Sequence, residues 1–417
     1  MISPKLFNFT KNILLICGYI FFFSEVITGA IRYYFSKFGL TFLVYFPKIL
    51  LILSILFFFT TIILKGKIPK RIFLIFMLLL ISSITSILFV GNYKQITFGV
   101  YILIPFIYGI IIGPIFIKNI EKYKNFIFTL WIIAATGVFI NFFYKWPWIG
   151  FTYDLGSIHV EGSREWSTAG FERLSGFGRI SAATASQILL LGITLFLTIK
   201  SLIFRSIIWL LSGIAIVLTT TKTTIGIWLF LTLIFFLSKI LTLKFFKPLP
   251  IILSLAGILL PLSTLYIHYN LSISNFYTFL LFASFEMRLT DTWPMTFDLI
   301  TNYGNSILGR GIGGIGSAQQ YFEEYIYSPA DNLSLYLYAV FGLSGIVLLI
   351  IIGVLSSLKT SNSIYGKFVF FLSVACLLQG LSLSIIEDPF FATCLGMVIS
   401  FLFSSSKYFK HKHYIEV

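Results

Sequence analysis

The sequence predicts an all-α polytopic integral membrane protein with about twelve transmembrane helices. Hydrophobic residues make up 58% of the 417 residues and charged residues only 11%, which is far more apolar than the average soluble domain. Apolar runs long enough to cross a bilayer recur along the chain. The basic residues fall in the short loops between these runs, as the positive-inside rule requires of cytoplasmic loops.

The apolar runs divide the chain into candidate membrane spans of about 17 to 25 residues. They cover residues 13–31, 40–64, 72–90, 96–117, 126–144, 181–199, 206–221, 223–238, 249–266, 333–357, 368–385 and 389–405. The first run lacks a small-residue cleavage site, so we expect it to be retained as a signal anchor. We expect one transmembrane domain over residues 1–417.

The net charge of +15 does not indicate a nucleic-acid partner, because such a partner needs basic residues gathered on one soluble face. Here the basic residues alternate between loops, which places both termini in the cytoplasm. They are Lys65, Lys67, Lys70, Arg71, Lys118, Lys122, Lys124, Lys200, Arg205, Lys239, Lys244, Lys247, Lys359, Lys367, Lys407, Lys410 and Lys412.

The acidic residues test this topology independently, because it rests on lysine and arginine alone. Most of the 15 acidic residues fall on the predicted outer side. They are Asp154, Glu161, Glu165, Glu172, Glu286, Asp291, Asp298, Glu323, Glu324, Asp331, Glu387 and Asp388. We therefore expect an external functional face.

Two outer loops are much longer than the others. The first covers residues 145–179, with Trp146 and Trp148 at its entry, where indoles favour the membrane interface. The second covers residues 267–331 and must carry its own structure, because long structureless loops are uncommon. We expect short interfacial helices over 275–288 and 289–303, followed by a glycine run that leads to Asp331 at the start of a membrane helix.

The glycine run superficially contains a dinucleotide fingerprint. That fingerprint requires a βαβ unit, which this chain lacks. Two interpretations remain: a flexible outer loop, or a backbone that can approach a bulky substrate without side-chain clashes. The glycines are Gly309, Gly311, Gly313, Gly314 and Gly316.

Cations on the outer side break the positive-inside pattern and therefore need a reason. The candidates are Arg164, Arg173, Arg179, Lys222, Arg288 and Arg310. Lys222, within LTTTKTTIGIW, either snorkels to the interface or holds a phosphate group with the neighbouring hydroxyls. Arg288 could instead form an ion pair with the nearby Glu286 or Asp291. We expect one of Arg173 and Arg179 to face the same site as these cations.

Carboxylates at a membrane surface are candidate general bases. Asp331 is the first candidate, although at the start of a helix it could also be a plain N-cap. Glu387, followed by Asp388 in an outer turn, is the second. His159 and His268 lie alone and are not favoured.

The three cysteines give no metal or disulfide pattern. Cys17, Cys376 and Cys394 all fall within apolar runs and lack metal-ligand spacing, so we interpret them as packing residues.

At Asp331 the sequence resembles a family. Asp331-Asn332, nine residues to Phe341, and then Gly342-Leu343-Ser344-Gly345 resemble the motif of the O-antigen ligase and Wzy-type O-antigen polymerase superfamily. In that motif, His or Asp precedes Asn, a spacer and Gly-x-x-Gly. The segments RLSGFGRISAATA, LTTTKTTIG, and MRLTDTW followed by ILGRGIGG are similar to further family motifs, in the same order over residues 170–350.

The resemblance implies an inverting, metal-independent glycosyltransferase that needs no cofactor and uses oligosaccharides linked to undecaprenyl diphosphate. Asp331 would be the base, and Arg173 or Arg179, Lys222 and Arg288 would hold the diphosphate. Asn332 and Arg310 join the expected substrate-binding residues. Aspartate stands where ligases carry histidine, which favours a polymerase. Lysine at 222 replaces the usual arginine, which argues against bidentate phosphate binding there.

The implied location is the bacterial inner membrane, with a periplasmic active site. A chain-length regulator and a flippase are candidate partners. The alternatives are an O-antigen ligase that transfers glycan to lipid A-core and, from another class, a polysaccharide flippase or transporter. A flippase needs cations along a path within its helices, whereas the outer cations here lie at helix ends. A structural membrane subunit does not explain those cations.

Overall fold

The computed structural model describes residues 4–64, 66, 68–155, 158–168, 170–269 and 276–403. These residues are mainly helical. The first half of the chain forms α1 (Pro4–Val26), α2 (Thr28–Lys37), a 3-10 turn (Thr41–Tyr45), α3 (Phe46–Leu64), α4 (Lys70–Phe89), α5 (Tyr93–Lys118), α6 (Ile120–Phe143), α7 (Ser181–Thr198) and α8 (Leu202–Leu218).

The second half continues with helices throughout. It forms α9 (Lys222–Ile240), a 3-10 turn (Leu243–Phe246), α10 (Leu249–Ser263), α11 (Phe276–Met287), a π-turn (Arg288–Thr292), α12 (Trp293–Tyr303), α13 (Ser317–Phe322), a 3-10 turn (Glu324–Ile326), α14 (Leu333–Phe341), α15 (Leu343–Lys359), α16 (Ile364–Gly380) and α17 (Pro389–Leu402).

The predicted membrane spans are recovered as apolar helices. Seven segments are long and apolar enough to cross a membrane: Asn8–Val26, Thr41–Leu64, Ile72–Phe89, Tyr93–Lys118, Ile120–Phe143, Ser181–Thr198 and Leu243–Ser263. Shorter apolar helices cover Leu202–Leu218, Lys222–Ser238, Leu343–Lys359, Ile364–Gly380 and Pro389–Leu402. The described chain therefore has the helices of a multi-pass membrane protein.

Several residues used in the sequence argument lie outside the described part of the chain. They are Lys65, Lys67, Asn275, residues 404–405 at the end of the last predicted run, Lys407, Lys410 and Lys412, together with the side chains of Lys70, Arg71, His159 and Lys239.

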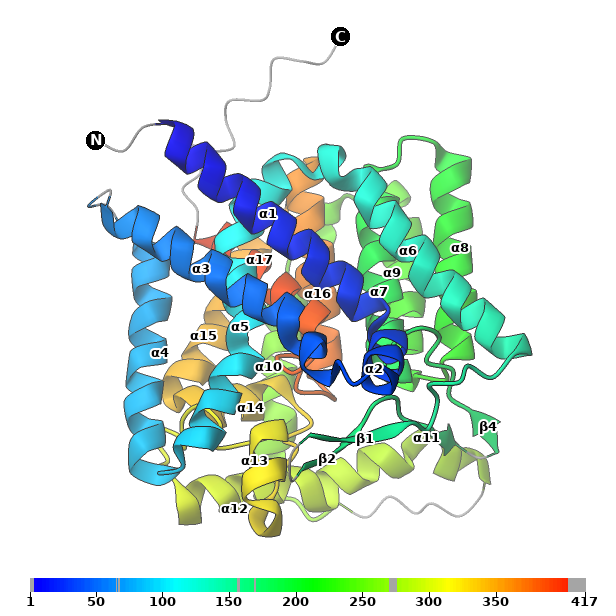
Figure 1. Cartoon of the computed structure of the whole chain (residues 1–417). Helices are drawn as coiled ribbons and strands as arrows, with labels where there is room; N and C mark the ends of the chain where they lie inside the picture. Colours follow the sequence, from blue (N-terminus) through cyan, green and yellow to red (C-terminus); the bar gives the residue numbers. More distant parts are fainter. Residues whose placement is uncertain are drawn as a thin grey trace.

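The first long loop forms two short β-hairpins, which the sequence did not predict. Strand β1 (Thr152–Leu155) pairs antiparallel with β2 (Ile158–Glu161), and β3 (Ser167–Thr168) pairs with β4 (Phe171–Glu172). Strands this short show too little alternation to be recognised. Figure 1 shows β1, β2, β4, α11, α12 and α13 gathered at one end of the helices. We call this the strand-bearing end.

The second long loop carries the two predicted short helices. They are α11 and α12, and the π-turn Arg288–Thr292 joins them. Single π-turns within helices are rare and often mark functional positions. Here the turn places Arg288 at the junction.

The predicted span 333–357 is broken at Gly342, so α14 and α15 are separate helices. Gly342 has a φ of 62°, a left-handed conformation that favours glycine. A Cβ atom here would lie 2.0 Å from the Ile307 carbonyl oxygen, and the Leu343 N–H donates to that same oxygen (2.9 Å). The approach of residue 307 therefore explains the break, and hydropathy cannot reveal it.

The glycine run is not the flexible outer loop that one interpretation expected, because residues 309–316 are all buried. Cβ atoms at Gly309, Gly311 and Gly313 would meet atoms of Ala339, Ser86 and Gln95, respectively. The glycines thus let this loop approach the protein's own helices α4, α5 and α14. The alternative expectation, approach to a substrate, does not describe these three positions.

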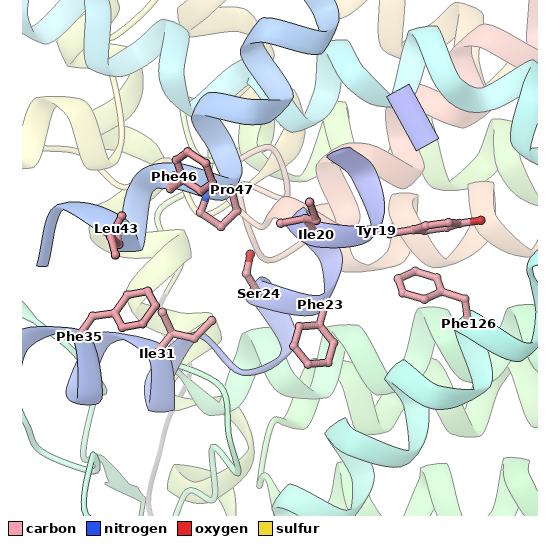
Figure 2. Close-up of a pocket in the computed structure, with 10 residues that line it drawn as sticks. All are labelled: Tyr19, Ile20, Phe23, Ser24, Ile31, Phe35, Leu43, Phe46, Pro47 and Phe126. Atoms are coloured by element: carbon pink, nitrogen blue, oxygen red, sulfur yellow. The ribbon is translucent and has the colours of Figure 1, made fainter. Parts of the chain in front are cut away.

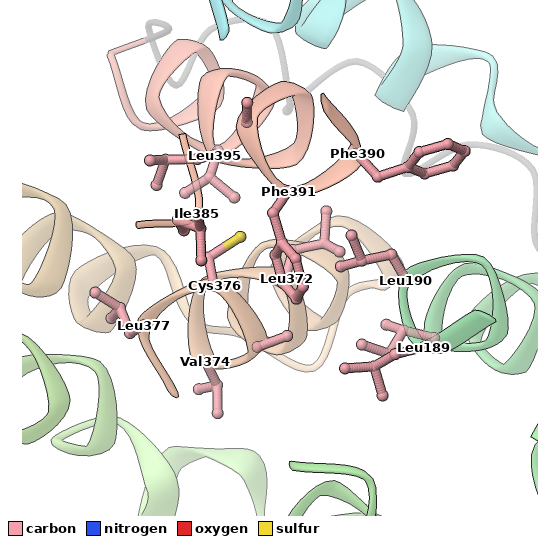
Figure 3. Close-up of a cluster of buried hydrophobic side chains, with 14 of the residues drawn as sticks. Leu189, Leu190, Leu372, Val374, Cys376, Leu377, Ile385, Phe390, Phe391 and Leu395 are labelled. Carbon is pink, nitrogen blue, oxygen red and sulfur yellow. The ribbon is translucent and has the colours of Figure 1, made fainter. Parts of the chain in front are cut away.

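The core lies where α7, α16 and α17 meet (Figure 3). Leu189 and Leu190 of α7 face Leu372 of α16, and Phe391 of α17 points into the same cluster. Cys376 also lies within this core, and the structure records Cys17 and Cys394 as free thiols too. Together they agree with the predicted packing role of the cysteines.

Candidate active site

The start of α14 separates the roles of Asp331 and Asn332. The Asn332 side chain is the N-cap, because its Oδ1 accepts hydrogen bonds from Ser334 N (2.7 Å) and Leu335 N (3.2 Å). Its Nδ2 donates to the Leu381 carbonyl oxygen (3.2 Å). The N-cap alternative for Asp331 is therefore wrong. Asn332 is fully buried and occupied by these bonds, so it acts as structural support rather than as a substrate ligand.

Asp331 forms an ion pair with Arg288, which lies earlier in the same long loop. Arg288 Nη2 lies 3.2 Å from Asp331 Oδ2, and both side chains are partly buried. Arg288 therefore pairs with Asp331 and not with Glu286 or Asp291, its expected partners from sequence. Burial raises the pKa of the Asp331 carboxyl, and the Arg288 charge opposes the shift.

The backbone of Asp331 is fixed in an uncommon conformation. Asp331 has a φ of 45° and Ala330 a φ of 59°, which are rare for residues with side chains. Trp293 Nε1 donates to the Asp331 carbonyl oxygen (3.4 Å), and the Trp293 side chain is fully buried. The buried indole of the predicted MRLTDTW motif therefore anchors Asp331.

Two further predicted cations, Arg173 and Lys222, are in electrostatic reach of this ion pair. The charges of Arg173 and Arg288 both act on the Lys222 ammonium group. Lys222 is the exposed first residue of α9, and Arg173 follows β4. We call Arg173, Lys222 and Arg288 the first cation cluster.

Two of these cations have a buried N–H donor that makes no hydrogen bond to the described residues. Arg288 Nε and Arg173 Nε are buried and have no hydrogen-bond partner within the described residues. Arg173 also lies over the Trp166 ring (4.8 Å to the centroid). Unsatisfied donors in a positive environment are suited to binding an anion.

Arg179 belongs to a different group of charges, although it lies only six residues after Arg173. The charges of Arg32 and Tyr153 act on its guanidinium group, and the Tyr321 hydroxyl forms a hydrogen bond with it. Its Nε donates to the Glu161 carbonyl oxygen (3.1 Å). The structure therefore resolves the sequence alternative by placing Arg173 with Lys222 and Arg179 with Arg32.

Glu387 lies in the turn between α16 and α17. It accepts hydrogen bonds from the Ser317 backbone N–H (2.7 Å) and the Ser317 hydroxyl (2.9 Å). Burial raises the pKa of Glu387 to about 7; the Asp331 charge adds to this shift, whereas the Ser317 hydrogen bonds and the Lys48 ammonium oppose it. Glu387 is therefore held in place and titrates near neutral pH.

The neighbouring Asp388 has a structural role. Its Oδ1 caps α17 by accepting hydrogen bonds from Phe390 N (2.9 Å) and Phe391 N (3.1 Å). Burial raises the pKa of Asp388 to about 6, and the capping bonds oppose the shift. The acidic pair predicted from sequence thus divides into a cap and an available carboxylate.

Tyr327 and Ser317 are site residues that sequence reasoning missed. Burial raises the pKa of Tyr327 to about 12, and the charges of Glu387 and Asp331 add to the shift. Its hydroxyl is therefore near both carboxylates and remains protonated. A lone tyrosine and a serine in a polar loop carry no sequence pattern that could have revealed either role.

Arg310, a predicted substrate ligand, is buried and bonded to other residues of the protein. Its side chain is 2% exposed, and its Nη2 lies 2.9 Å from Glu323 Oε1. Nε donates to the Tyr303 carbonyl oxygen (3.1 Å) and Nη1 to that of Gly314 (2.9 Å). These contacts make Arg310 a support of the glycine-rich loop.

Hydrogen bonds tie the elements of the site together. Thr223 at the start of α9 lies 3.0 Å from the Ser382 hydroxyl, and Thr224 donates to Gln379 Oε1 (3.5 Å). The turn that carries Ser382 and Glu387 is therefore joined to α9 as well as to Asn332. Thus the starts of α9, α14 and α17 form one assembly.

The structure contains an apolar groove apart from these carboxylates (Figure 2). It has a volume of about 590 Å³. Its lining comes from α1, α2, α3, α6 and the 3-10 turn before α3: Tyr19, Ile20, Phe23, Ser24, Ile31, Phe35, Leu43, Phe46, Pro47 and Phe126. We call this the apolar groove.

Within the described part of the chain, no group of three or more histidine, cysteine, aspartate or glutamate residues is arranged to hold a metal ion. His268 lies just beyond α10. The described side chains of the candidate site are the carboxylates Asp331 and Glu387, the Tyr327 hydroxyl and the first cation cluster.

Comparisons with protein-family models, with curated protein sequences and with solved structures find no match to this chain.

Proposed function

We propose that this protein polymerises oligosaccharide repeat units linked to undecaprenyl diphosphate into O-antigen or a related surface polysaccharide. The reaction is an inverting glycosyl transfer that releases undecaprenyl diphosphate. The observation that supports it best is that Arg288 contacts Asp331 while the charges of Arg173 and Arg288 both act on Lys222. These residues come from four segments far apart in the sequence, and each belongs to a motif of the resemblance to O-antigen polymerases.

The first cation cluster would hold the diphosphate of the growing chain. Cations aimed at the departing oxygens stabilise the charge that develops there in the transition state. The unsatisfied Nε atoms of Arg173 and Arg288 supply donors for this purpose. Lys222 adds a positive charge without bidentate geometry.

The geometry favours Glu387 over Asp331 as the base. In an inverting displacement, the attacking and leaving oxygens lie on opposite faces of the sugar carbon, so the base should not touch the diphosphate cations. Asp331 contacts Arg288 directly. Glu387 is hydrogen-bonded to Ser317 instead, and its pKa of about 7 suits a base near neutral pH.

The proposed reaction is a single displacement at C1 of the donor sugar. An acceptor hydroxyl gives its proton to the Glu387 carboxylate while its oxygen forms a bond to C1 of the growing chain's reducing-end sugar. The bond from C1 to the phosphate oxygen breaks, and its electron pair leaves with undecaprenyl diphosphate. Asp331 positions Arg288, and Asn332 and Asp388 fix the helix starts that carry the carboxylates.

We place the strand-bearing end in the periplasm and the helices in the bacterial inner membrane. The lysine and arginine pattern of the other loops supports this orientation. The acidic residues of the two long segments support it independently. A chain-length regulator and a flippase would act alongside the enzyme.

Gene deletion in the native host, followed by gel analysis of its lipopolysaccharide, tests this function. We expect loss of the long ladder while one repeat unit remains attached to the core. Complementation with the wild-type chain should restore the ladder. An unchanged ladder in the deletion strain would contradict the proposal.

The same gel separates the alternatives. Loss of every attached unit would identify a ligase that transfers glycan to lipid A-core. Accumulation of lipid-linked units on the cytoplasmic leaflet would identify a flippase. Either result would replace the polymerase proposal.

A further inference from the structure

A second group of cations lies at the strand-bearing end. Arg32 is on α2, Lys48 is near the start of α3 and Arg179 precedes α7. The charges of all three act on the Glu25 carboxylate near the end of α1. Arg32 also acts on Lys48 and on Arg179. We call Arg32, Lys48 and Arg179 the second cation cluster.

Direct contacts hold this cluster in place. Arg32 Nη1 donates to the Tyr153 hydroxyl (2.8 Å), and Lys48 Nζ lies 3.9 Å from the centroid of the Tyr101 ring. The segment before Arg179 is bonded to α2, because Gly29 N donates to the Phe177 carbonyl oxygen (3.0 Å). Residues from the loops and from the membrane helices thus converge on one charged site.

The second cation cluster has an N–H donor that is unpaired within the described chain and an excess of positive charge that could bind an anion. Arg32 Nε is buried and has no hydrogen-bond partner among the residues described. Three cations act on the one carboxylate of Glu25, and the Glu387 carboxylate, whose pKa is about 7, also acts on Lys48. The net charge of these groups is therefore between about +1 and +2. A diphosphate diester carries about two negative charges and accepts charge-assisted hydrogen bonds through several oxygens. The charges are therefore complementary.

The apolar groove begins beside this cluster. Three of its lining residues are the immediate chain neighbours of charged residues: Ser24 precedes Glu25, Ile31 precedes Arg32 and Pro47 precedes Lys48. Figure 2 shows Ile31, Ser24, Phe46 and Pro47 around the same hollow. A groove lined by apolar side chains and bordered by cations fits an amphiphile with a hydrocarbon chain and an anionic head.

We propose that the second cation cluster binds the diphosphate of the second substrate, the lipid-linked acceptor, and that the apolar groove holds its polyprenyl chain. The proposal rests on the proposed function, because polymerisation requires two lipid-linked glycans on one enzyme. The first cation cluster then takes the donor.

The position of Glu387 supports this division. The charge of Asp331, which contacts Arg288, raises the pKa of Glu387, and the charge of Lys48 in the second cation cluster lowers it. Glu387 is therefore within electrostatic reach of both Asp331, the partner of Arg288, and Lys48 of the second cation cluster. An acceptor held by the second cluster would bend its repeat unit back over the strand-bearing end, so that its far hydroxyl reaches Glu387.

Native mass spectrometry of the full chain in phosphatidylcholine nanodiscs tests this proposal, with undecaprenyl diphosphate as the probe. We expect two bound molecules per wild-type chain. The double variant Arg32→Gln/Lys48→Gln should retain one, with the apparent Kd of the lost site raised about tenfold or more. Lys37→Gln, which removes an exposed charge from the same helix α2, should still bind two.

A groove variant supplies an independent measurement. Ser24→Trp should fill the apolar groove and remove the same molecule without changing any charge. Ile16→Trp is the matched control, because Ile16 is 56% exposed on α1 and does not line the groove. It should bind as the wild type does.

The outcomes separate this inference from the proposed function. If wild type binds one molecule and Lys222→Gln/Arg288→Gln removes it, the acceptor site is wrong and the donor site stands. If wild type binds none, both proposals fail. Two molecules bound to Arg32→Gln/Lys48→Gln, or displacement of the second molecule by phosphatidylglycerol at equal concentration, would overturn the acceptor site alone.

Discussion

Arg288 Nη2 lies 3.2 Å from Asp331 Oδ2, and this ion pair joins the π-turn of the second long loop to the start of α14. The two residues are far apart in sequence, and Arg288 pairs with Asp331 rather than with its sequence neighbours Glu286 and Asp291. Because Asp331 also affects Glu387, the pair connects the first cation cluster to the candidate base.

Replacing Asp331 should weaken polymerisation without removing the base. Asp331→Asn removes the charge that orients Arg288, so we expect the rate to fall about 10- to 100-fold, in line with the loss of a positioning contact. The rise of the rate with pH should remain, with its midpoint at a lower pH, because the Asp331 charge raises the pKa of Glu387 in the wild type. The measurement is the initial rate of ladder formation in membranes containing equal amounts of each variant.

Replacing Glu387 should remove the base itself. The carboxylate must be ionised to accept a proton, so the wild-type rate should rise with pH through about 7. Glu387→Gln should lower the rate about 100- to 10,000-fold and abolish this rise. If Asp331→Asn abolishes the rise and Glu387→Gln keeps it, Asp331 is the base.

The Glu387 carboxylate should make the folded protein less stable as the pH rises, whereas it makes the reaction faster. Burial raises the pKa of Glu387, so the folded state favours the protonated form. The stabilisation is present below its ordinary pKa of 4.5 and is lost as the pH rises through about 7. Thermal unfolding should therefore show that Glu387→Gln raises Tm relative to wild type at pH 8 but not at pH 4.

Lys222 should act through its charge. Lys222→Arg keeps the positive charge and should retain polymerisation within a few-fold, whereas Lys222→Ala should lower it about tenfold or more, the size of one lost charge-assisted contact. Ladder formation again supplies the measurement. Equal activity in the two variants would reduce Lys222 to an interfacial anchor.

The helices could be predicted from sequence because their signal is local. Hydropathy predicts the apolar helices, and the length of the second loop predicts that it carries short helices, which are α11 and α12. The site could be predicted only in part, since it depends on contacts between distant segments. Nothing local distinguishes Arg173 from Arg179, yet one joins Lys222 and the other Arg32.

The errors have the same origin. The sequence predicts Arg310 as a substrate ligand because an arginine on the outer side breaks the positive-inside pattern. In the structure its charged partner is Glu323 of the same chain. Likewise, Asp331 and Asn332 are both good N-cap residues, and only the backbone conformation shows that Asn332 takes the cap.

Arg310 should matter for folding rather than for substrate binding. Arg310→Gln leaves the partly buried Glu323 carboxylate without its charged partner, which typically costs about 3–5 kcal/mol. Glu323→Gln should be destabilising as well, which a substrate ligand would not predict. Lys145→Gln breaks an exposed ion pair with Glu165 and should cost less than about 1 kcal/mol. Thermal unfolding in detergent measures all three.

Gly342 should tolerate no side chain. Its φ is 62°, and a Cβ atom would lie 2.0 Å from the Ile307 carbonyl oxygen, so alanine must displace the backbone that separates α14 from α15. We expect Gly342→Ala to lower the free energy of unfolding by about 2 kcal/mol or more, from strain and lost packing together. The matched control is Gly226→Ala, because Gly226 lies within helix α9 and its Cβ would meet no atom within 4 Å. That control should be neutral, or stabilising by up to about 1 kcal/mol, because alanine favours the helix. Equal stability of the two variants would mean that residue 307 does not cause the break between α14 and α15.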